Sequence, residues 1–419
     1  MNYDNHPCFS EGAKHSFGRI HLPVAPNCNL QCNYCNRDFD CVNESRPGVA
    51  SAILKPRQAI RYLDEVLERI PNIAVVGIAG PGDPFANPEE TLETLRLVRE
   101  KYPEIMLCVA TNGLNLSRYA DDLETLKISH VTVTVNAVEP QIGSKIYAWA
   151  RFASRMYRGV EAANLLLSNQ IEAIRKLKER NVLVKINSVV IPGINDSHVA
   201  AVAREMAALG ADLMNCIPLY HVAGTPFADI APLPQEAAES IRREAGGFLP
   251  QMKHCTRCRA DAVGLLGRDQ TDEVRSLMRK AAIGGARENE PYVAVASMEG
   301  LLVNQHLGEA SQLWIFGQRD GKAELVDRRF TPSSGSGADR WQQMADLLQD
   351  CRGVLVSGIG RAPQAVLEEA GLRIVVMEGF AREGVEAILS GREIPRMLLR
   401  RAGSCGQGLT CSGTGMGCG

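Results

Sequence analysis

The sequence predicts an α/β protein in which a partial (β/α)6 barrel is followed by a smaller α/β domain. Six short apolar runs alternate with helix-length amphipathic segments through the first 220 residues. A second set of such runs follows a small, charged stretch at residues 281–290. Apolar strands that alternate with helices form a parallel sheet covered by helices, and a barrel or partial barrel is the economical arrangement.

The apolar runs predict the strands of the barrel, and the amphipathic segments between them predict its helices. The expected strands are residues 19–24, 73–79, 105–110, 130–136, 182–190 and 213–219. The expected helices are residues 57–69, 88–101, 117–127, 161–179 and 197–209. We expect Asn87 to cap the second of these helices and Pro88 to be its first residue, because both residue types favour helix starts.

The smaller domain has its own pattern of strands and helices. The expected strands are residues 291–297, 311–318, 323–330, 353–360 and 373–380, with helices near 339–350, 363–370 and 381–390. Asp320 and Gly321 form the expected turn of a hairpin. The predicted organisation is a barrel with an N-terminal arm and a closing segment (1–280), a linker (281–290), the second domain (291–395) and a flexible glycine- and cysteine-rich tail (396–419).

Composition excludes several classes of protein. The 46 basic and 48 acidic residues leave a net charge of −2, which argues against a broad surface for nucleic acid or membrane. The N-terminus has no secretory signal pattern, and no run of about 18 apolar residues occurs. We therefore expect a soluble, cytoplasmic protein. Because the compartment is reducing, the 13 clustered cysteines favour metal ligation over disulfides.

Polar and glycine-rich stretches follow the predicted barrel strands. In such barrels the chemistry lies on the loops that leave the carboxyl ends of the strands. The convergence predicts one active site on that face, with cofactor-binding candidates Gly80, Gly82, Asp83, Thr111, Asn112, Asn136 and Ser188.

Three cysteines, Cys28, Cys32 and Cys35, follow the first strand in the stretch "CNLQCNYC". Such a trio can be buried packing, a structural zinc site, a disulfide remnant or an iron-sulfur ligand set. Three thiolates can hold three irons of a cubane cluster and leave the fourth open, whereas a structural zinc site needs a fourth ligand.

The spacing C-x3-C-x2-C, with Tyr34 before the last cysteine, resembles the signature of the radical S-adenosylmethionine (SAM) superfamily, whose fold is a partial TIM-type barrel. The resemblance implies that the trio holds a 4Fe-4S cluster whose open iron binds SAM. It also implies that Gly82 and Asp83 of "GPGDP" meet the amino group of SAM, although the family more often has Glu at the second position.

Further potential ligands surround this motif. His21, Cys41 and Cys108 can converge beside the SAM cluster, and Cys8 of the N-terminal arm can meet Cys255 and Cys258 at the open side of the barrel. Each has a simpler interpretation. Cys108 in an apolar strand is more often core than ligand, His21 alone is more often a satisfied core histidine, and zinc would use the C-x2-C pair equally well.

The stretch "HPCFSEGAKHSFGRIHLPVAPNCNLQCNYCNRDFDCVNESRPGV" and the following "GIAGPGDPFANP" resemble the NifB family of nitrogenase cofactor biosynthesis. "VAVASMEGLLVNQHLGEASQLWIF" resembles the NifX and NafY type of cofactor-binding module, with an RNase H-like fold. The resemblance implies two further 4Fe-4S substrate clusters, K1 on His21, Cys41 and Cys108, and K2 on Cys8, Cys255 and Cys258. It implies their fusion, with a carbide from a SAM methyl group and a ninth sulfur, into the 8Fe-9S cofactor precursor.

The resemblance also implies partners: iron-sulfur donors of the NifU and NifS type, a ferredoxin electron donor, a NifX-type carrier and a NifEN-type scaffold. Beside Cys41, Glu44 is the candidate base and Arg46 a candidate partner for the SAM carboxylate or the cluster charge; a salt-bridged loop is the equal alternative. His306 is the candidate for holding or handing over the product, by analogy with the NifX-like module. Cys405, Cys411 and Cys418 have no assigned role.

Two other functions stay open. One is a radical SAM peptide-modifying enzyme with auxiliary clusters, and the other is a non-catalytic iron-sulfur carrier. The intact cysteine motif and the GPGDP turn speak against the carrier. Peptide-modifying enzymes of this kind do not use ligands from before and after the first motif, such as Cys8, His21 and Cys41, which speaks against that function.

Overall fold

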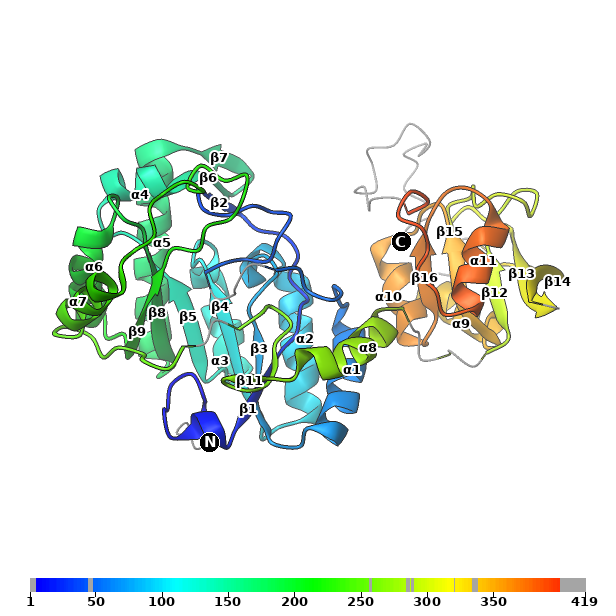
Figure 1. Ribbon diagram of the computed structural model, residues 1–419. Coiled ribbons are helices and arrows are strands. Elements are labelled where there is room, and N and C mark those ends of the chain that lie inside the picture. Colours follow the sequence, from blue (N-terminus) through cyan, green and yellow to red (C-terminus); the bar gives the residue numbers. More distant parts are fainter. Residues whose placement is uncertain are drawn as a thin grey trace. The chain divides into compact units, whose positions relative to one another are not determined.

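The computed structural model describes residues 5–43, 48–255, 258–283, 287, 290–319, 321–333 and 338–399. The chain divides into two compact units, Met1–Ala282 and Ile283–Gly419, each with its own sheet and core (Figure 1). Within the described ranges, no helix combines the length and the apolar character that crossing a membrane requires.

The first unit is built on an eight-stranded sheet with the order β11-β10-β1-β3-β4-β5-β8-β9. Strands β1 to β9 in this order pair in parallel, while β10 and β11 continue the sheet with antiparallel pairing beside β1. The strands are β1 (Gly18–His21), β3 (Ile73–Ile78), β4 (Met106–Thr111), β5 (His130–Thr134), β8 (Leu183–Val190), β9 (Leu213–Pro218), β10 (Val263–Leu265) and β11 (Arg268–Asp269). The six parallel strands coincide with the six predicted runs, so the partial barrel is confirmed.

Helices of the first unit pack their apolar sides against this sheet, except α4 (Pro140–Ile146), whose Ile146 packs with Leu30 and Ala150 of a smaller sheet. They are α1 (Pro56–Arg69), α2 (Pro88–Lys101), α3 (Ala120–Thr125), α4 (Pro140–Ile146), α5 (Gly159–Glu179), α6 (Val199–Ala208), α7 (Gln235–Ala245) and α8 (Thr271–Ile283). Short 3-10 turns occupy Ala13–His15, Pro84–Ala86, Leu116–Tyr119 and Asp196–His198. Leu107 of β4 joins the core with the helices, whereas its neighbour Cys108 lines a cavity inside the barrel. This alternation follows from the two-residue period of a strand.

Asn87 stands at the N-cap of α2, and Pro88 opens the helix as predicted. The Asn87 side chain does not cap the helix. Its amide nitrogen donates to the carbonyl oxygens of Asn27 (2.9 Å) and Asp83 (2.8 Å), and its oxygen accepts from the Asn27 backbone (3.1 Å). Asn87 therefore links the first and second strand-end loops, a role that helix propensity does not reveal.

A small sheet with the order β2-β6-β7 was not expected from the sequence. It consists of β2 (Leu30–Cys32), β6 (Tyr147–Phe152) and β7 (Arg155–Tyr157). Strand β2 lies within the cysteine stretch and pairs antiparallel with β6, so that Leu30 stands opposite Ala150. The hairpin thus fixes the backbone of the cysteine loop.

The second unit has a five-stranded sheet with the order β14-β13-β12-β15-β16. Its elements are β12 (Tyr292–Val295), β13 (Gln312–Arg319), β14 (Lys322–Phe330), β15 (Cys351–Val356), β16 (Arg373–Val376), α9 (Ala338–Leu347), α10 (Arg361–Glu369) and α11 (Ala381–Leu389). Strands β12 to β14 pair antiparallel, and β15 and β16 continue in parallel. Helices α9 and α10 pack on one face and α11 on the other. This confirms the predicted α/β domain; the β13–β14 hairpin forms as expected, while Asp320 of its turn lies outside the described residues.

Candidate active site

A first cavity lies at the carboxyl ends of the barrel strands and contains the cysteine trio. We call it the upper cavity. It is lined by Cys28, Leu30, Cys32, Tyr34, Cys35, Arg37, Cys41, Asn43, Ala79, Gly82, Asp83, Ala110, Thr111, Asn112 and Thr134. The structure thus brings the three predicted cluster ligands together with Gly82, Asp83, Thr111 and Asn112.

Tyr34 anchors the cysteine loop from within. Its side chain is 1% exposed, and its hydroxyl donates to Asn43 Oδ1 (2.7 Å) while accepting from Asn136 Nδ2 (2.8 Å). Asn136 Oδ1 in turn accepts from the backbone of Val189 (2.8 Å). Asn136 therefore supports the cavity from behind rather than lining it. From the sequence, Tyr34 was noted only as part of the cysteine motif, and no role was predicted for Asn43.

Gly82 is glycine because the backbone of the first strand-end loop passes directly over it. A Cβ atom at Gly82 would lie 2.0 Å from the carbonyl oxygen of Asn27. The Gly82 and Asp83 backbone nitrogens donate to Ala25 O (2.6 Å) and Asn27 O (2.8 Å). This contact joins the GPGDP turn to the cysteine loop.

Asp83 is buried, and both of its carboxylate oxygens accept hydrogen bonds. Oδ1 accepts from the Phe85 backbone (2.9 Å), and Oδ2 accepts from Thr111 Oγ1 (2.9 Å) and from the Asn112 backbone (2.7 Å). Burial raises the pKa of Asp83, against these hydrogen bonds. The carboxylate thus fixes the "TNG" turn relative to the GPGDP turn.

Asn112 reaches the cysteine loop. Its Nδ2 donates to Asn29 Oδ1 (2.8 Å) and lies 3.8 Å from Cys28 Sγ. Two predicted cofactor-binding residues, Gly80 and Ser188, do not line the upper cavity. Ser188 Oγ instead donates to the carbonyl oxygen of Val135.

Cys41 lines the upper cavity with the trio. Its backbone nitrogen donates to Pro81 O (2.8 Å), which holds it against the GPGDP turn. The predicted catalytic residues that follow it, Glu44 and Arg46, lie outside the described residues.

A second cavity lies deeper in the barrel and contains the remaining sequence-predicted ligands. We call it the lower cavity. It is lined by His6, Cys8, Phe9, His21, Ile78, Ala79, Cys108, Val109, Ala110, Thr132, Lys185, Met252, Cys255, Cys258 and Leu266. Ala79 and Ala110 line both cavities, so the two spaces adjoin. The single site expected from the sequence is therefore two neighbouring cavities, and Cys41 does not line the same one as His21 and Cys108.

Strand register explains why His21 and Cys108 meet. Both are paired with Gly77, His21 across β1 and β3 and Cys108 across β3 and β4. A Cβ atom at Gly77 would lie 2.9 Å from Cys108 Sγ and 3.5 Å from His21 Nε2. The missing side chain of Gly77 leaves room between two potential ligands.

His21 has a fixed tautomer. Its Nδ1 lies 3.0 Å from the carbonyl oxygen of Arg259, which can only accept, so Nδ1 carries the proton. Burial lowers the pKa of His21 to about 4, and the ring is therefore neutral near pH 7. The Nε2 lone pair is available to a metal, the arrangement that metal-ligating histidines usually show.

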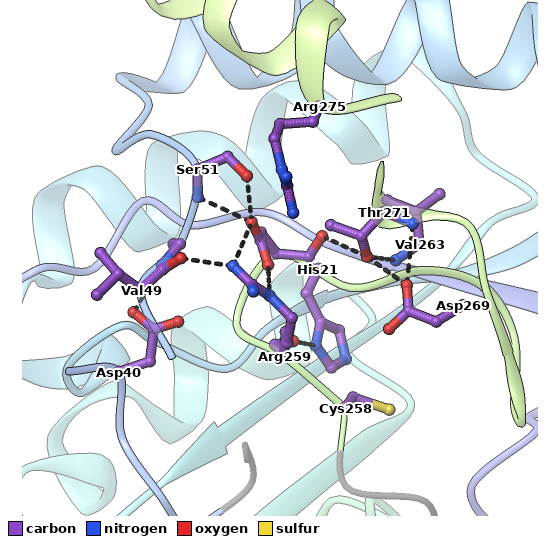
Figure 2. Close-up of polar contacts among 12 residues, drawn as sticks. His21, Asp40, Val49, Ser51, Cys258, Arg259, Val263, Asp269, Thr271 and Arg275 are labelled. Carbon is purple, nitrogen blue, oxygen red and sulfur yellow. Dashed lines mark hydrogen bonds and ion pairs between the residues drawn. The ribbon is translucent and has the colours of Figure 1, made fainter. Parts of the chain in front are cut away.

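The segment after the barrel is tied down by the network in Figure 2. Asp261 is fully buried; its Oδ1 accepts from Arg259 Nε (2.8 Å), and its Oδ2 accepts from the backbone and the hydroxyl of Ser51 (both 2.8 Å). The Arg259 carbonyl also orients His21, so the residue that follows Cys258 in the chain holds the His21 ring (Figure 2).

Arg19 is a buried cation that the sequence did not single out. It is 2% exposed, and its guanidinium donates to Cys258 Sγ from two nitrogens (3.3 and 3.2 Å) and to Leu265 O (3.0 Å). Lys185, 4% exposed, lines the lower cavity, whereas Arg19 lies outside the lining and donates to the lining residue Cys258. A buried cation favours an anionic neighbour, so Arg19 suits a thiolate at Cys258 and Lys185 suits an anionic occupant.

The thiol chemistry of both cavities fits iron-sulfur clusters. Burial raises the pKa of Cys28 and of Cys8 to about 12, and it raises the pKa of Cys32 and Cys41 as well. Such thiols lose their protons when metal binds. Within the described ranges, no three His, Cys, Asp or Glu side chains are grouped around a single metal ion. A cluster, by contrast, takes one ligand per iron over a larger volume.

His306 of the second unit is half-buried beside Gly358, with which it forms an isolated bridge. Its Nδ1 accepts from the Gly308 backbone (3.1 Å), and burial lowers the pKa of its ring. The tail cysteines Cys405, Cys411 and Cys418 lie outside the described residues.

Comparison with known proteins agrees with this arrangement. The radical SAM superfamily matches residues 22–206, and the family described as dinitrogenase iron-molybdenum cofactor matches residues 290–391. The FeMo cofactor biosynthesis protein NifB of Chlorobaculum tepidum is 51% identical over 422 residues, covering 100% of this chain and 99% of that protein. NifB of Klebsiella pneumoniae is 42% identical, covering 88% of this chain and 86% of that protein.

Among solved structures, SuiB of Streptococcus suis bound to S-adenosylmethionine is 14% identical with a TM-score of 0.41, over 56% of this chain and 50% of that chain. These values are too low to support a statement about the site. The full-length identity to the curated relatives is sufficient by itself: the chain belongs to the NifB family of FeMo cofactor biosynthesis proteins.

Proposed function

We propose that the chain is a radical SAM enzyme of FeMo cofactor assembly that fuses two 4Fe-4S clusters into an 8Fe-9S core with a central carbide. The observation that carries the proposal is the pair of adjoining cavities, one lined by the cysteine trio and the other by five further potential ligands. A reactive centre and a separate store of substrate iron and sulfur would thus share one barrel.

In the upper cavity, Cys28, Cys32 and Cys35 would hold the resident 4Fe-4S cluster. When bound, this cluster and SAM supply a carbon radical and a methyl group. Of the proposed SAM-binding residues, Gly82, Asp83, Thr111 and Asn112 line the cavity and would contact SAM. Gly80, Asn136 and Ser188 would act behind them by supporting the loops.

In the lower cavity, the substrate clusters would be held by few ligands, which suits clusters that must leave. Cys8, Cys255 and Cys258 would hold K2, and His21, Cys108 and Cys41 would hold K1. Because Cys41 lines the upper cavity, we propose that K1 lies where the cavities adjoin, beside Ala79 and Ala110. K1 would then be the substrate nearest to SAM.

The later removal of protons from the transferred carbon requires a base, for which Glu44 remains the proposed residue, with Arg46 as its charged neighbour. We further propose that the second unit receives the product through His306. The proposed partners are NifU- and NifS-type iron-sulfur donors, a ferredoxin, a NifX-type carrier and a NifEN-type scaffold.

Anaerobic reconstitution tests the proposal. The protein is loaded with iron and sulfide, its iron is counted, and reductant and SAM are added. Three cubane clusters correspond to about 12 irons per chain. We expect that number, together with both S-adenosylhomocysteine from methyl transfer and 5′-deoxyadenosine from radical formation.

Other outcomes distinguish the alternatives. About 4 irons, or 5′-deoxyadenosine without S-adenosylhomocysteine, would exclude the fusion reaction, since the substrate clusters or the methyl transfer would be missing. Peptide modification by a radical SAM enzyme with auxiliary clusters would give the latter result. A carrier would retain iron and cleave no SAM.

A further inference from the structure

His6 is a buried histidine of the lower cavity to which the proposed reaction assigns no role. It is 3% exposed and lines the cavity with the three proposed K2 ligands, Cys8, Cys255 and Cys258. Its ring lies against Phe9 (5.0 Å between centroids) and His130 (4.1 Å). These contacts fix the ring within the N-terminal arm.

The tautomer of His6 follows from one hydrogen bond. The backbone N–H of Cys8 donates to His6 Nδ1 (3.1 Å), so Nδ1 must present a lone pair. The neutral ring then carries its proton on Nε2. That atom is buried and has no hydrogen-bond partner in the described part of the chain. A buried donor in a protein normally finds an acceptor.

The two histidines of the lower cavity, His21 and His6, therefore present opposite groups at Nε2: a lone pair on His21 and an N–H on His6. His21 donates from Nδ1 to the Arg259 carbonyl and offers the Nε2 lone pair, as an iron ligand does. His6 accepts at Nδ1 and offers an N–H. For His6 to bind iron through Nε2, it would have to lose the hydrogen bond that shapes the turn before Cys8.

The charges of the cavity indicate what would accept this hydrogen bond. Lys185 brings a buried cation to the lining, and Arg19, which does not line the cavity, donates to Sγ of the lining residue Cys258. A buried cation and an N–H donor both favour an anionic occupant. Hydrogen bonds to cluster sulfur are one of the means by which proteins set cluster potentials.

We propose that His6 is a positioning residue that donates its Nε2 proton to a sulfide or ligand sulfur of the substrate cluster held by Cys8, Cys255 and Cys258. This inference rests on the proposed function, because it requires a cluster at these cysteines. The hydrogen bond stabilises the reduced, more negative cluster and does not coordinate iron.

The test uses a background in which Cys28, Cys32 and Cys35 are replaced by alanine, so that only the substrate clusters remain. His6→Leu removes the donor, His6→Gln keeps an N–H near the same position, and His15→Ala changes an exposed histidine of the same arm as the matched control. Iron content and redox titrations followed by electron paramagnetic resonance are measured for each variant.

We expect about 8 irons in the background. We expect His6→Leu to shift the midpoint potential to more negative values, with the ratio of reduced to oxidised cluster at a fixed potential falling about tenfold, as for one hydrogen bond to a charged group. His6→Gln and His15→Ala should retain the original potential. Loss of about 4 irons in His6→Leu but not in His6→Gln would also support the donor role.

Three results would overturn the inference. Equal potentials and equal iron in His6→Leu and the control would show that the donor is not used, and a shift or iron loss shared by His6→Leu and His6→Gln would show that packing matters instead. Loss of nitrogen hyperfine coupling in His6→Leu would make His6 an iron ligand. No iron in the background at all would instead refute the proposed function itself, so the two failures are distinguishable.

Discussion

The two cavities of the barrel are assembled in different ways. All residues that line the upper cavity lie between Cys28 and Thr134, and eight of the lining residues named above come from the segment between β1 and α1. The lower cavity draws on the N-terminal arm, on the middle of the barrel strands and on the segment after the barrel. The upper site is thus a local motif on a rigid frame, whereas the lower site exists only through tertiary contacts. The two should respond separately to mutation.

Removal of one ligand from each cavity is expected to have the largest effect. Cys32→Ala should abolish SAM cleavage, because Cys32 is a proposed ligand of the radical-forming cluster. Cys255→Ala should retain SAM cleavage but stop fusion, because Cys255 belongs to the lower cavity. The measurement is 5′-deoxyadenosine and iron-sulfur product in parallel assays. Equal loss of both products in both variants would refute the division of ligands.

Substitution of Gly77 tests the lower cavity without replacing a proposed ligand. A Cβ atom there would lie 2.9 Å from Cys108 Sγ and 3.1 Å from His21 Cδ2, so Gly77→Ala must displace one of them. We expect iron content to fall by about 4 from about 12, with SAM binding retained. Gly12→Ala is the control, since its nearest atom would be 3.9 Å away. Unchanged iron in Gly77→Ala would argue against K1 at this position.

The anchor of the closing segment should matter for stability and its pH dependence. Asp261→Asn leaves Arg259 without its buried carboxylate and should lower the free energy of unfolding by about 3 kcal/mol at pH 7. Burial raises the pKa of Asp261, but the hydrogen bonds from Arg259 and Ser51 outweigh it and hold the pKa below its ordinary value of 3.8. A lowered pKa stabilises the fold fully above that ordinary value and progressively less below it.

Thermal melts of wild type and Asp261→Asn from pH 7 to pH 3 provide the measurement. The difference in stability should be constant down to about pH 5 and shrink toward pH 3. A difference that grows on acidification would contradict the assigned role. Glu239→Gln, on the exposed side of α7, is a control that should change stability little.

The smallest effect is expected from a substitution at Tyr34, whose hydrogen bonds support the upper cavity. Tyr34→Phe removes one hydroxyl and leaves Asn43 Oδ1 and Asn136 Nδ2 without the hydrogen bonds it makes. We expect a loss of about 1–3 kcal/mol in unfolding free energy and little change in iron content. Tyr157→Phe, on the half-buried end of β7, is the matched control in chemical denaturation. A large loss of iron in Tyr34→Phe would mean that the hydroxyl acts on the cluster itself.

The barrel could be predicted because runs rich in apolar and β-branched residues alternate with amphipathic segments of helix length. The β6–β7 hairpin could not. Its turn is made by Ala153 and Ser154 at φ 47° and 66°, whereas hairpin turns with positive φ are usually signalled by Asn or Gly. No local pattern marks such a turn.

The cysteine trio was visible as a spacing, and the register of β1, β3 and β4 explains why His21 and Cys108 meet. The separation of Cys41 from these two could not be read from the sequence, because it depends on how a loop folds back over the GPGDP turn. His6 was missed for a related reason. A histidine near a chain terminus is usually exposed. The His6 ring is buried because it packs against Phe9 of the same arm and His130 of β5.

The long chain separation within the lower cavity has a consequence for biosynthesis on the ribosome. Synthesis proceeds from the N-terminus, and every residue that lines the upper cavity has been made once Thr134 is added. The lower cavity waits for Cys258 and Leu266, about twice as far along the chain. Until then Cys8 lacks its lining neighbours Cys255 and Cys258. The nascent protein therefore completes the lining of the upper cavity well before that of the lower cavity.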